Sequence, residues 1–137
     1  MIVQYNQDPE DFNGGHYTPY PAELSHDRVT DEQATVEILA PKDPVFQFPN
    51  QITERDFDGW VQERGLYFMH SWDSHFVPLL STGDPEEQPL RGGLLEAKYG
   101  KGTYIYTGYA FFRQLPAGVP GAVRLFVNLI SAGHQPK

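Results

Sequence analysis

Cysteine is absent from the 137 residues of this chain. The chain therefore has no disulfide, no thiolate nucleophile and no cysteine-ligated zinc or iron–sulfur cluster. Basic residues are also few, because 10 Lys and Arg stand against 18 Asp and Glu, which gives a net charge of −8. This negative charge opposes binding to a phosphate backbone, so we expect no nucleic-acid partner.

Long apolar runs are missing as well. The stretch Leu125–Ile130 is interrupted by Asn128 and is far too short to span a bilayer. The N-terminus has no basic segment followed by an apolar one, so it does not resemble a signal peptide. We therefore predict a soluble chain with no membrane partner.

Aromatic residues are plentiful, with 9 Phe, 8 Tyr and 2 Trp, and 39% of the chain is hydrophobic. This composition is enough to bury a core, and the length predicts a single domain over residues 1–137. The 13 Gly and 12 Pro indicate frequent turns and few helices.

Strand-like composition predicts most of the elements. We expect strands over residues 1–6, 35–39, 66–69 and 76–80. Pro78 predicts that the last of these lies at a sheet edge or bulge. Residues 7–30 show no sustained period and predict a long irregular loop, and residues 45–48 predict a short extended piece.

The strongest local signal is a hairpin. Residues 94–99 and 103–107 both read as strands, and they flank Gly100-Lys101-Gly102. Glycine on both sides of Lys101 supplies the positive φ that a tight turn needs.

Two helices are expected. Thr53 and Asp56 resemble a capping box at the start of a helix over 54–63, which would bury Trp60. Pro120 predicts the first turn of a second helix over 120–132. One face of that helix would carry four apolar residues: Val123, Phe126, Val127 and Ile130. With Leu125 and Leu129 the helix is apolar nearly all round, which predicts deep packing.

Several segments carry a family resemblance. The segment 96–108 and the helix that ends in Leu125–Ile130 resemble the C-terminal part of class I glutamine-amidotransferase-like domains, including the ThuA-like branch. Residues 28–32, 57–68 and 115–122 resemble the C-terminal domain of long bacterial proteins that begin with a PIG-L/LmbE-type deacetylase domain. The resemblance covers residues 2–130.

The resemblance implies a partial flavodoxin-like α/β fold. It implies a β-rich mixed sheet, a short helix, a packed C-terminal helix, and a first half of the sheet that lies outside this chain. It also implies a non-catalytic accessory domain without a cofactor, because the nucleophilic Cys of the amidotransferases and the His-Pro-Asp-Asp-type zinc motif of the deacetylases are both missing. Such a domain would bind carbohydrate or pack against a catalytic domain, and long relatives of this kind suggest an extracytoplasmic location.

Loop aromatics are the candidate ligand-binding residues. Tyr17, Tyr20 and Trp72 could stack on sugar C–H surfaces, with the Asp73 carboxylate binding hydroxyls. Trp60 has the same chemistry, but its place on the predicted helix assigns it to the core.

A metal-dependent hydrolase is the alternative. His70, Asp73 and His75 fall within six residues, and His16 and His26 lie in the predicted loop 7–30. Their spacing matches no established zinc pattern, so we expect surface loop residues and no metal.

The remaining charged residues have structural explanations. Asp56, Asp58 and Glu63 suit the acidic start of a helix better than acid–base catalysis. Arg28 is expected to pair with Asp27 or Asp31 beside it in the sequence. A last group is predicted to solvate a loop: Asp84, Glu86 and Glu87.

A structural dimerisation module is the third possibility. A half-fold exposes apolar edge positions around residues 2–5, so we expect self-association through that strand, or packing against a missing N-terminal domain.

Overall fold

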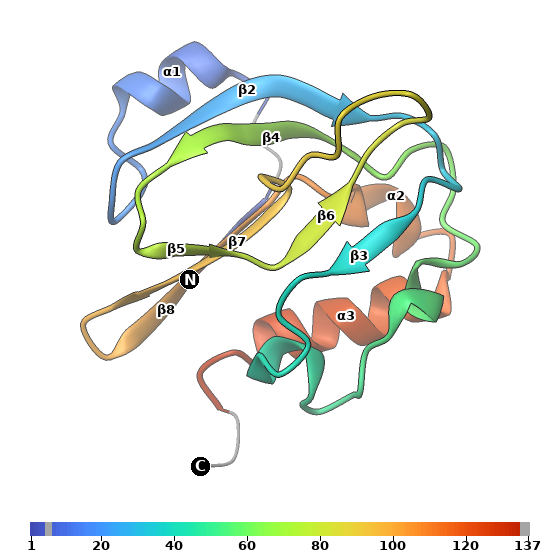
Figure 1. Ribbon diagram of the computed structural model, residues 1–137. Coiled ribbons are helices and arrows are strands. Elements are labelled where there is room, and N and C mark those ends of the chain that lie inside the picture. The colour runs from blue at the N-terminus through green and yellow to red at the C-terminus, as the bar shows by residue number, and fades with distance from the viewer. Residues whose placement is uncertain (5–6, 135–137) are drawn as a thin grey trace.

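A computed structural model describes residues 1–4 and 7–134 of the chain (Figure 1). The strands and helices, with 3₁₀ helices written η, are in chain order β1 (Ile2–Gln4), α1 (Pro9–Gly14), β2 (Ala22–Val29), β3 (Val36–Ile38), η1 (Pro44–Phe46), η2 (Glu54–Phe57), β4 (Gly65–Trp72), β5 (Phe76–Pro78), β6 (Leu80–Thr82), β7 (Leu94–Tyr99), β8 (Gly102–Thr107), α2 (Phe111–Gln114) and α3 (Pro120–Ile130). The fold is mixed α/β, with a mixed sheet and few helices. Among the described residues no helix is long and apolar enough to cross a membrane.

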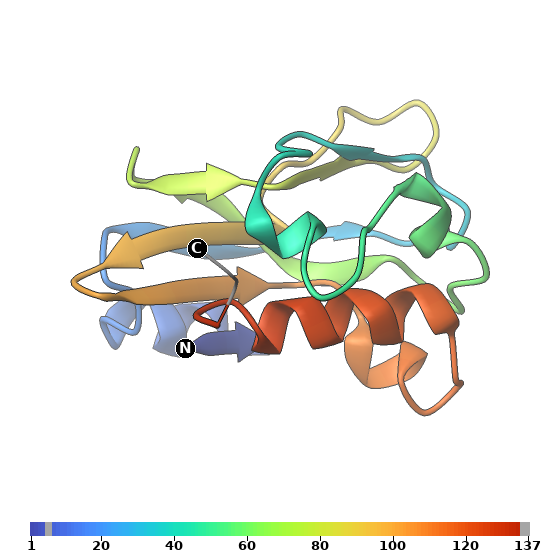
Figure 2. The same cartoon turned by 90° about the horizontal axis from the view of Figure 1, so that it is seen from below.

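The main sheet has the strand order β1-β8-β7-β5. β1 is parallel to β8, and the other pairs are antiparallel. A smaller sheet, β2–β4, lies over one face of the main sheet (Figure 1). The other, β3–β6, lies beyond the β5 edge, and the C-terminal end of α3 lies beside β1 (Figure 2). Pro78 belongs to the edge strand β5, as the sequence predicts.

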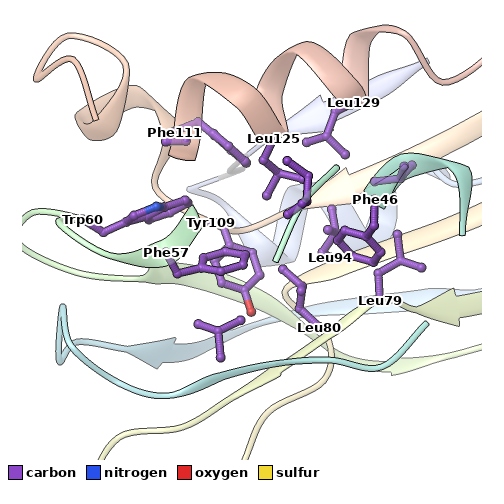
Figure 3. Packing of buried hydrophobic residues seen from close by; sticks show 14 of the residues in the cluster. Phe46, Phe57, Trp60, Leu79, Leu80, Leu94, Tyr109, Phe111, Leu125 and Leu129 are labelled. Atoms are coloured by element: carbon purple, nitrogen blue, oxygen red, sulfur yellow. The ribbon is translucent and has the colours of Figure 1, made fainter. Parts of the chain in front are cut away.

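Two hydrophobic clusters form the core. The larger one packs under α3 and includes Phe46, Phe57, Trp60, Tyr109 and Leu125 (Figure 3). The smaller one lies between the main sheet and α1 with β2, and contains Phe12, Leu24, Met69, Phe76, Leu95, Ala97, Tyr104 and Tyr106. The prediction that Trp60 is a core residue is confirmed, since its side chain is buried.

The hairpin prediction is confirmed. β7 and β8 pair in register from Leu94 with Thr107 to Tyr99 with Gly102. Only one of the two turn glycines, Gly100, has a positive φ, of 57°. The turn therefore needs a single left-handed residue.

The prediction of an irregular segment over 7–30 is wrong. Asp8 caps α1 by accepting a hydrogen bond from the backbone N–H of Asp11, and Phe12 is buried. β2 follows, and its pairing with β4 shifts register three times. Those irregularities break the two-residue alternation that identifies a strand from sequence. The last three residues of β4 are His70 to Trp72, which the sequence placed in a loop.

Two further local predictions need correction. The extended piece over 45–48 is a 3₁₀ turn, η1, which Asp43 caps by accepting a hydrogen bond from the Val45 N–H. The helix over 54–63 is one turn, η2, although its capping box forms as expected, with the Thr53 N–H donating to Asp56. Gly59 then has a φ of +76°, which ends any continuation of the helix.

The C-terminal helix α3 begins at Pro120 as predicted and ends at Ile130, but its predicted face is wrong. Its buried residues are Gly121, Ala122, Leu125, Asn128 and Leu129, whereas Val123 and Ile130 are exposed. Asn128 is buried because its amide donates to the carbonyls of Val45 and Asn50, and its side-chain oxygen accepts from the Asn50 N–H. A satisfied polar side chain thus occupies a position where an apolar pattern would place none.

The N-terminal strand is confirmed over Ile2–Gln4; residues 5 and 6 lie outside the described part of the chain. The strand over 76–80 is two strands, β5 and β6, which belong to different sheets. Residue Leu79 between them lets the chain pass from one sheet to the other.

Candidate functional site

A cavity of about 490 Å³ lies between the chain that follows α1 and the tip of the β7–β8 hairpin. Its lining residues are Met1, His16, Tyr17, Thr18, Pro19, Tyr99, Gly102, Thr103 and Tyr104. Two of these are aromatic side chains that remain largely open to solvent, since Tyr17 is 58% exposed and Tyr99 is 62% exposed. Large aromatic rings are usually covered in a folded chain, so two exposed rings around one cavity mark this surface as a candidate binding site.

The chain positions Tyr17 through a close contact with glycine. A Cβ atom on Gly15 would lie 2.2 Å from Cε2 of Tyr17, so a larger residue at position 15 would displace the ring. His16 has a φ of 55°, a conformation that non-glycine residues rarely adopt. The Tyr17 ring also packs on Phe12, at 5.6 Å between centroids, and its carbonyl accepts a hydrogen bond from the Tyr104 hydroxyl. Local constraint and long-range contact together fix this residue.

Tyr104 closes the inner side of the cavity. It lies on β8 and is buried, and burial raises its pKa to about 12. A phenol with a raised pKa is a weaker acid than usual, and this one donates its proton in the hydrogen bond to Tyr17. Tyr104 therefore has the properties of a structural donor and not those of an acid catalyst.

Tyr20 connects the hairpin to the loop that follows β4. One face of its ring stacks on His75, at 4.0 Å between centroids and an interplanar angle of 9°. Its edge contacts are with Tyr99 and Phe76, and its hydroxyl donates to the Lys98 carbonyl. Because His75 covers one face, the ring of Tyr20 offers less stacking surface than Tyr17 does.

Tyr20 and Tyr17 also line a second cavity, of about 390 Å³, which shares residues 16–19 with the first. Asn13 borders it, but both polar atoms of the Asn13 side chain already bond to the backbone of Leu24. Glu23, which is exposed, brings a carboxylate to that lining.

Asp73 is engaged within its own loop. Its carboxylate accepts a hydrogen bond from the His75 N–H at 2.9 Å and contacts His75 Nδ1 at 2.5 Å. The hydrogen bond from the His75 backbone has the larger effect and the one from its side chain the smaller, and together they hold the pKa of Asp73 below its usual value. Asp73 thus orients the imidazole that stacks on Tyr20.

Trp72 lies at the end of β4 and is half-buried against the smaller core cluster. Its ring also abuts Gly92, where a Cβ would come within 3.0 Å of it. Trp72 and Asp73 line neither of the two cavities described above. Of the four ligand residues predicted from sequence, Tyr17 lies at the larger cavity and Tyr20 at the smaller one.

The histidines of the metal alternative are not brought together. His70 pairs with Asp27 at 3.2 Å, whereas His75 pairs with Asp73. Within residues 1–4 and 7–134, no group of three or more His, Asp or Glu side chains could hold a metal ion. Two of the three acidic residues considered for catalysis are paired: Asp56 bonds Arg124 at 2.9 Å and Glu63 bonds Arg113 at 3.0 Å.

The acidic loop prediction is wrong for Asp84. Its carboxylate is buried and accepts hydrogen bonds from the N–H groups of Thr30 and Asp31 and from the Thr30 hydroxyl. Burial alone would raise its pKa, but these hydrogen bonds outweigh burial and hold the pKa of Asp84 below its usual value. Arg28 pairs with this carboxylate at 3.5 Å, so the predicted partners Asp27 and Asp31 are also corrected.

A second buried carboxyl group, that of Glu96, has a raised pKa where Asp84 has a lowered one. Glu96 on β7 is only 6% exposed. Burial, together with a hydrogen bond and like charge from Asp43, raises its pKa from 4.5 to about 7, although Lys98 Nζ lies 3.1 Å away and opposes the shift. Glu96 does not line either cavity, so we assign its titration to stability.

The sequence did not single out Tyr99 or Thr103. Tyr99 precedes the hairpin turn, and an aromatic residue beside a turn glycine is the signal that could have found it. Thr103 brings a hydroxyl to the cavity that accepts a hydrogen bond from Lys98. The cavity therefore combines exposed ring faces with hydroxyl groups, which suits a ligand that presents both C–H surfaces and hydroxyls. Comparison with protein-family models, with curated proteins and with solved structures finds no match to this chain.

Proposed function

We propose that this chain is a non-catalytic binding module that takes carbohydrate at the cavity between Tyr17 and Tyr99. The observation that carries the proposal is the exposure of both tyrosine rings at one cavity of about 490 Å³. Sugar rings stack on aromatic faces through their C–H surfaces, and their hydroxyls need polar partners such as Thr103 and Thr18, which also line this cavity.

Binding is favoured over catalysis by the chemistry of the lining. The cavity has no cysteine and no carboxylate, and its buried phenol, Tyr104, has a pKa of about 12. Hydrolysis of a sugar bond ordinarily uses a pair of carboxyl groups on either side of the bond. The lining also includes His16 and Met1, but without a carboxylate it can hold a sugar and offers no pair of carboxyl groups to cleave it.

The finer fold relationship belongs to the same proposal. We propose that the mixed α/β fold is a partial flavodoxin-like, glutamine-amidotransferase-like domain of the kind attached to PIG-L/LmbE-type deacetylases. The parallel pairing of β1 with β8 and the packing of α3 against the core support this, together with the resemblance in sequence. The native setting would then be a larger deacetylase, in which this module holds the glycan.

A glycan array followed by titration calorimetry on each hit tests the binding function. We expect Tyr17→Ala and Tyr99→Ala each to weaken binding at least about tenfold, as loss of a central aromatic contact does. Phe112→Ala is the matched control, because Phe112 is also an exposed aromatic but lies on α2, outside the cavity lining. It should leave affinity unchanged.

Trp72→Ala tests whether Trp72 belongs to the binding surface, as the sequence predicts, or lies outside it, as the lining of the cavity indicates. If Tyr17 and Tyr99 form the platform, Trp72→Ala retains binding once its melting temperature confirms that it is folded. An array without any hit, or equal losses in the Tyr17, Tyr99 and Phe112 variants, would contradict a carbohydrate site at this cavity.

A further inference from the structure

The two cavities that share residues 16–19 are neighbouring parts of one surface. Their volumes, about 490 and 390 Å³, are each in the range of a small-molecule site. A ligand that stacks on Tyr17 and continues along residues 16–19 passes from the cavity at the hairpin tip into the cavity beside β2. The surface therefore has room for more than one sugar unit.

Charge distinguishes the second cavity from the first. The lining between Tyr17 and Tyr99 contains no Asp or Glu, whereas Glu23 lines the second cavity. Among residues 1–4 and 7–134, the Glu23 carboxylate has no ion-pair or hydrogen-bond partner. Neither Lys nor Arg lines this cavity in the described part of the chain. The carboxylate is therefore available to a ligand.

An available carboxylate selects a ligand group by charge and by hydrogen bonding. An ionised carboxylate only accepts hydrogen bonds, so its partner on the ligand must donate them. A positively charged donor makes the stronger bond, and the net charge of −8 attracts positive ligands to the chain. On a sugar, the group that both donates hydrogen bonds and is positively charged at neutral pH is a free amino group.

We propose that the ligand of this surface is an oligosaccharide that contains amino sugars, with one unit on Tyr17 and Tyr99 and the amino group of a neighbouring unit on Glu23. This inference rests on the proposed carbohydrate binding and names its ligand class. The two tyrosines bind a sugar ring whatever its charge, because they contact its C–H surface. Glu23 selects the free amine over the N-acetylated one, since acetylation removes the positive charge.

Titration calorimetry with three β-1,4-linked trimers, of glucosamine, N-acetylglucosamine and glucose, tests this selection. The measured quantity is the ratio of the affinity for the glucosamine trimer to the affinity for each neutral trimer. We expect a ratio of about three to five at low salt, which is the size of one exposed charge pair, and a smaller ratio at high salt.

Glu23→Gln should bring this ratio close to one. Glu37→Gln is the matched control, because Glu37 is also an exposed carboxylate on a strand but lines neither cavity. It makes the same change in net charge and should keep the ratio of the unmodified chain. Melting temperatures of both variants confirm that they are folded.

The outcomes separate this inference from the carbohydrate function on which it rests. Equal affinity for the three trimers, or no binding of the glucosamine trimer, would overturn the selection of an amino sugar. So would an equal fall of the ratio in Glu23→Gln and Glu37→Gln, because the preference would then come from the net charge of the chain. The carbohydrate function would survive each of these results as long as other glycans bind and the binding depends on Tyr17 and Tyr99.

Discussion

Glu96 makes the stability of this fold depend on pH. Its folded pKa of about 7 lies above the ordinary 4.5, owing to burial and to Asp43. A group with a raised folded pKa contributes fully to stability below its unfolded pKa, and this contribution is lost as the pH rises through the folded pKa. We therefore expect the free energy of unfolding to fall between about pH 4.5 and pH 7.

The size of this loss follows from the shift. At about 1.4 kcal/mol per pKa unit, a rise from 4.5 to about 7 corresponds to about 3 kcal/mol. This value already includes the opposing effect of Lys98, whose Nζ lies 3.1 Å from the carboxylate. It is a large fraction of the stability of a small domain.

Glu96→Gln removes the ionisable group while it keeps the size of the side chain. We expect this variant to show no decline over the same pH range and to be more stable than the unmodified chain at pH 8. Asp43→Asn should move the decline to lower pH, because it removes the like charge and still accepts the Val45 N–H bond that caps η1. Glu23→Gln, the same substitution at an exposed strand position, is the control.

Urea unfolding at a series of pH values measures these differences. The reasoning is refuted if the unmodified chain keeps a constant free energy of unfolding across this range. It is also refuted if Glu96→Gln retains the full decline, since the titrating group would then be another residue.

Two other substitutions test packing and charge burial, both by urea unfolding. Gly121→Ala should destabilise the fold by about 2 kcal/mol, because the new Cβ would lie 1.8 Å from the backbone oxygen of Asp56. Gly14→Ala is the control: its Cβ would have nothing within 4 Å, so this substitution should be neutral or stabilising. Equal effects of the two would contradict the close packing of α3 on η2. Asp84→Asn should lower the free energy of unfolding by about 1–3 kcal/mol at pH 7 and by less in acid. The reason is that the lowered pKa of Asp84 gives stability that is present above its ordinary pKa of 3.8 and is lost as the pH falls. A loss that does not change with pH would contradict a role for the ionised carboxylate.

Local signals predicted the elements that depend on nearby residues. The β7–β8 hairpin follows from Gly100 between two strand-like runs, and the start of α3 follows from Pro120. The capping box at Thr53 was also correct, but it begins a single turn, because the chain turns sharply at Gly59. A cap predicts where a helix begins and says little about its length.

Long-range contacts decided the features that the sequence did not predict. The register shifts of β2 against β4 hide its alternation, and the buried face of α3 includes Asn128 because Asn50 and Val45 supply its partners. Asp84 is buried because the backbone of residues 30–31 bonds to it. No spacing within the sequence reveals such partners.

The candidate site also contains one residue that the sequence predicted and one that it did not. Tyr17 was identified as an exposed loop aromatic, and this was possible from composition alone. Its partner Tyr99 comes from a hairpin far along the chain, and only the tertiary structure brings the two rings to one cavity. Trp72 and Tyr17 look alike in sequence, and contact with Gly92 and the smaller core cluster distinguishes them.

The parallel pairing of β1 with β8 also governs the order of folding. The first hydrogen bond at this end of the ladder joins Met1 to Thr103, across 102 residues of chain. A contact over such a distance forms late, because the chain between its ends must first be ordered. During synthesis β1 leaves the ribosome before the β7–β8 hairpin does, so it cannot pair with β8 until that hairpin has emerged. β1 therefore joins β8 late in folding, although it precedes β8 by about a hundred residues in the sequence.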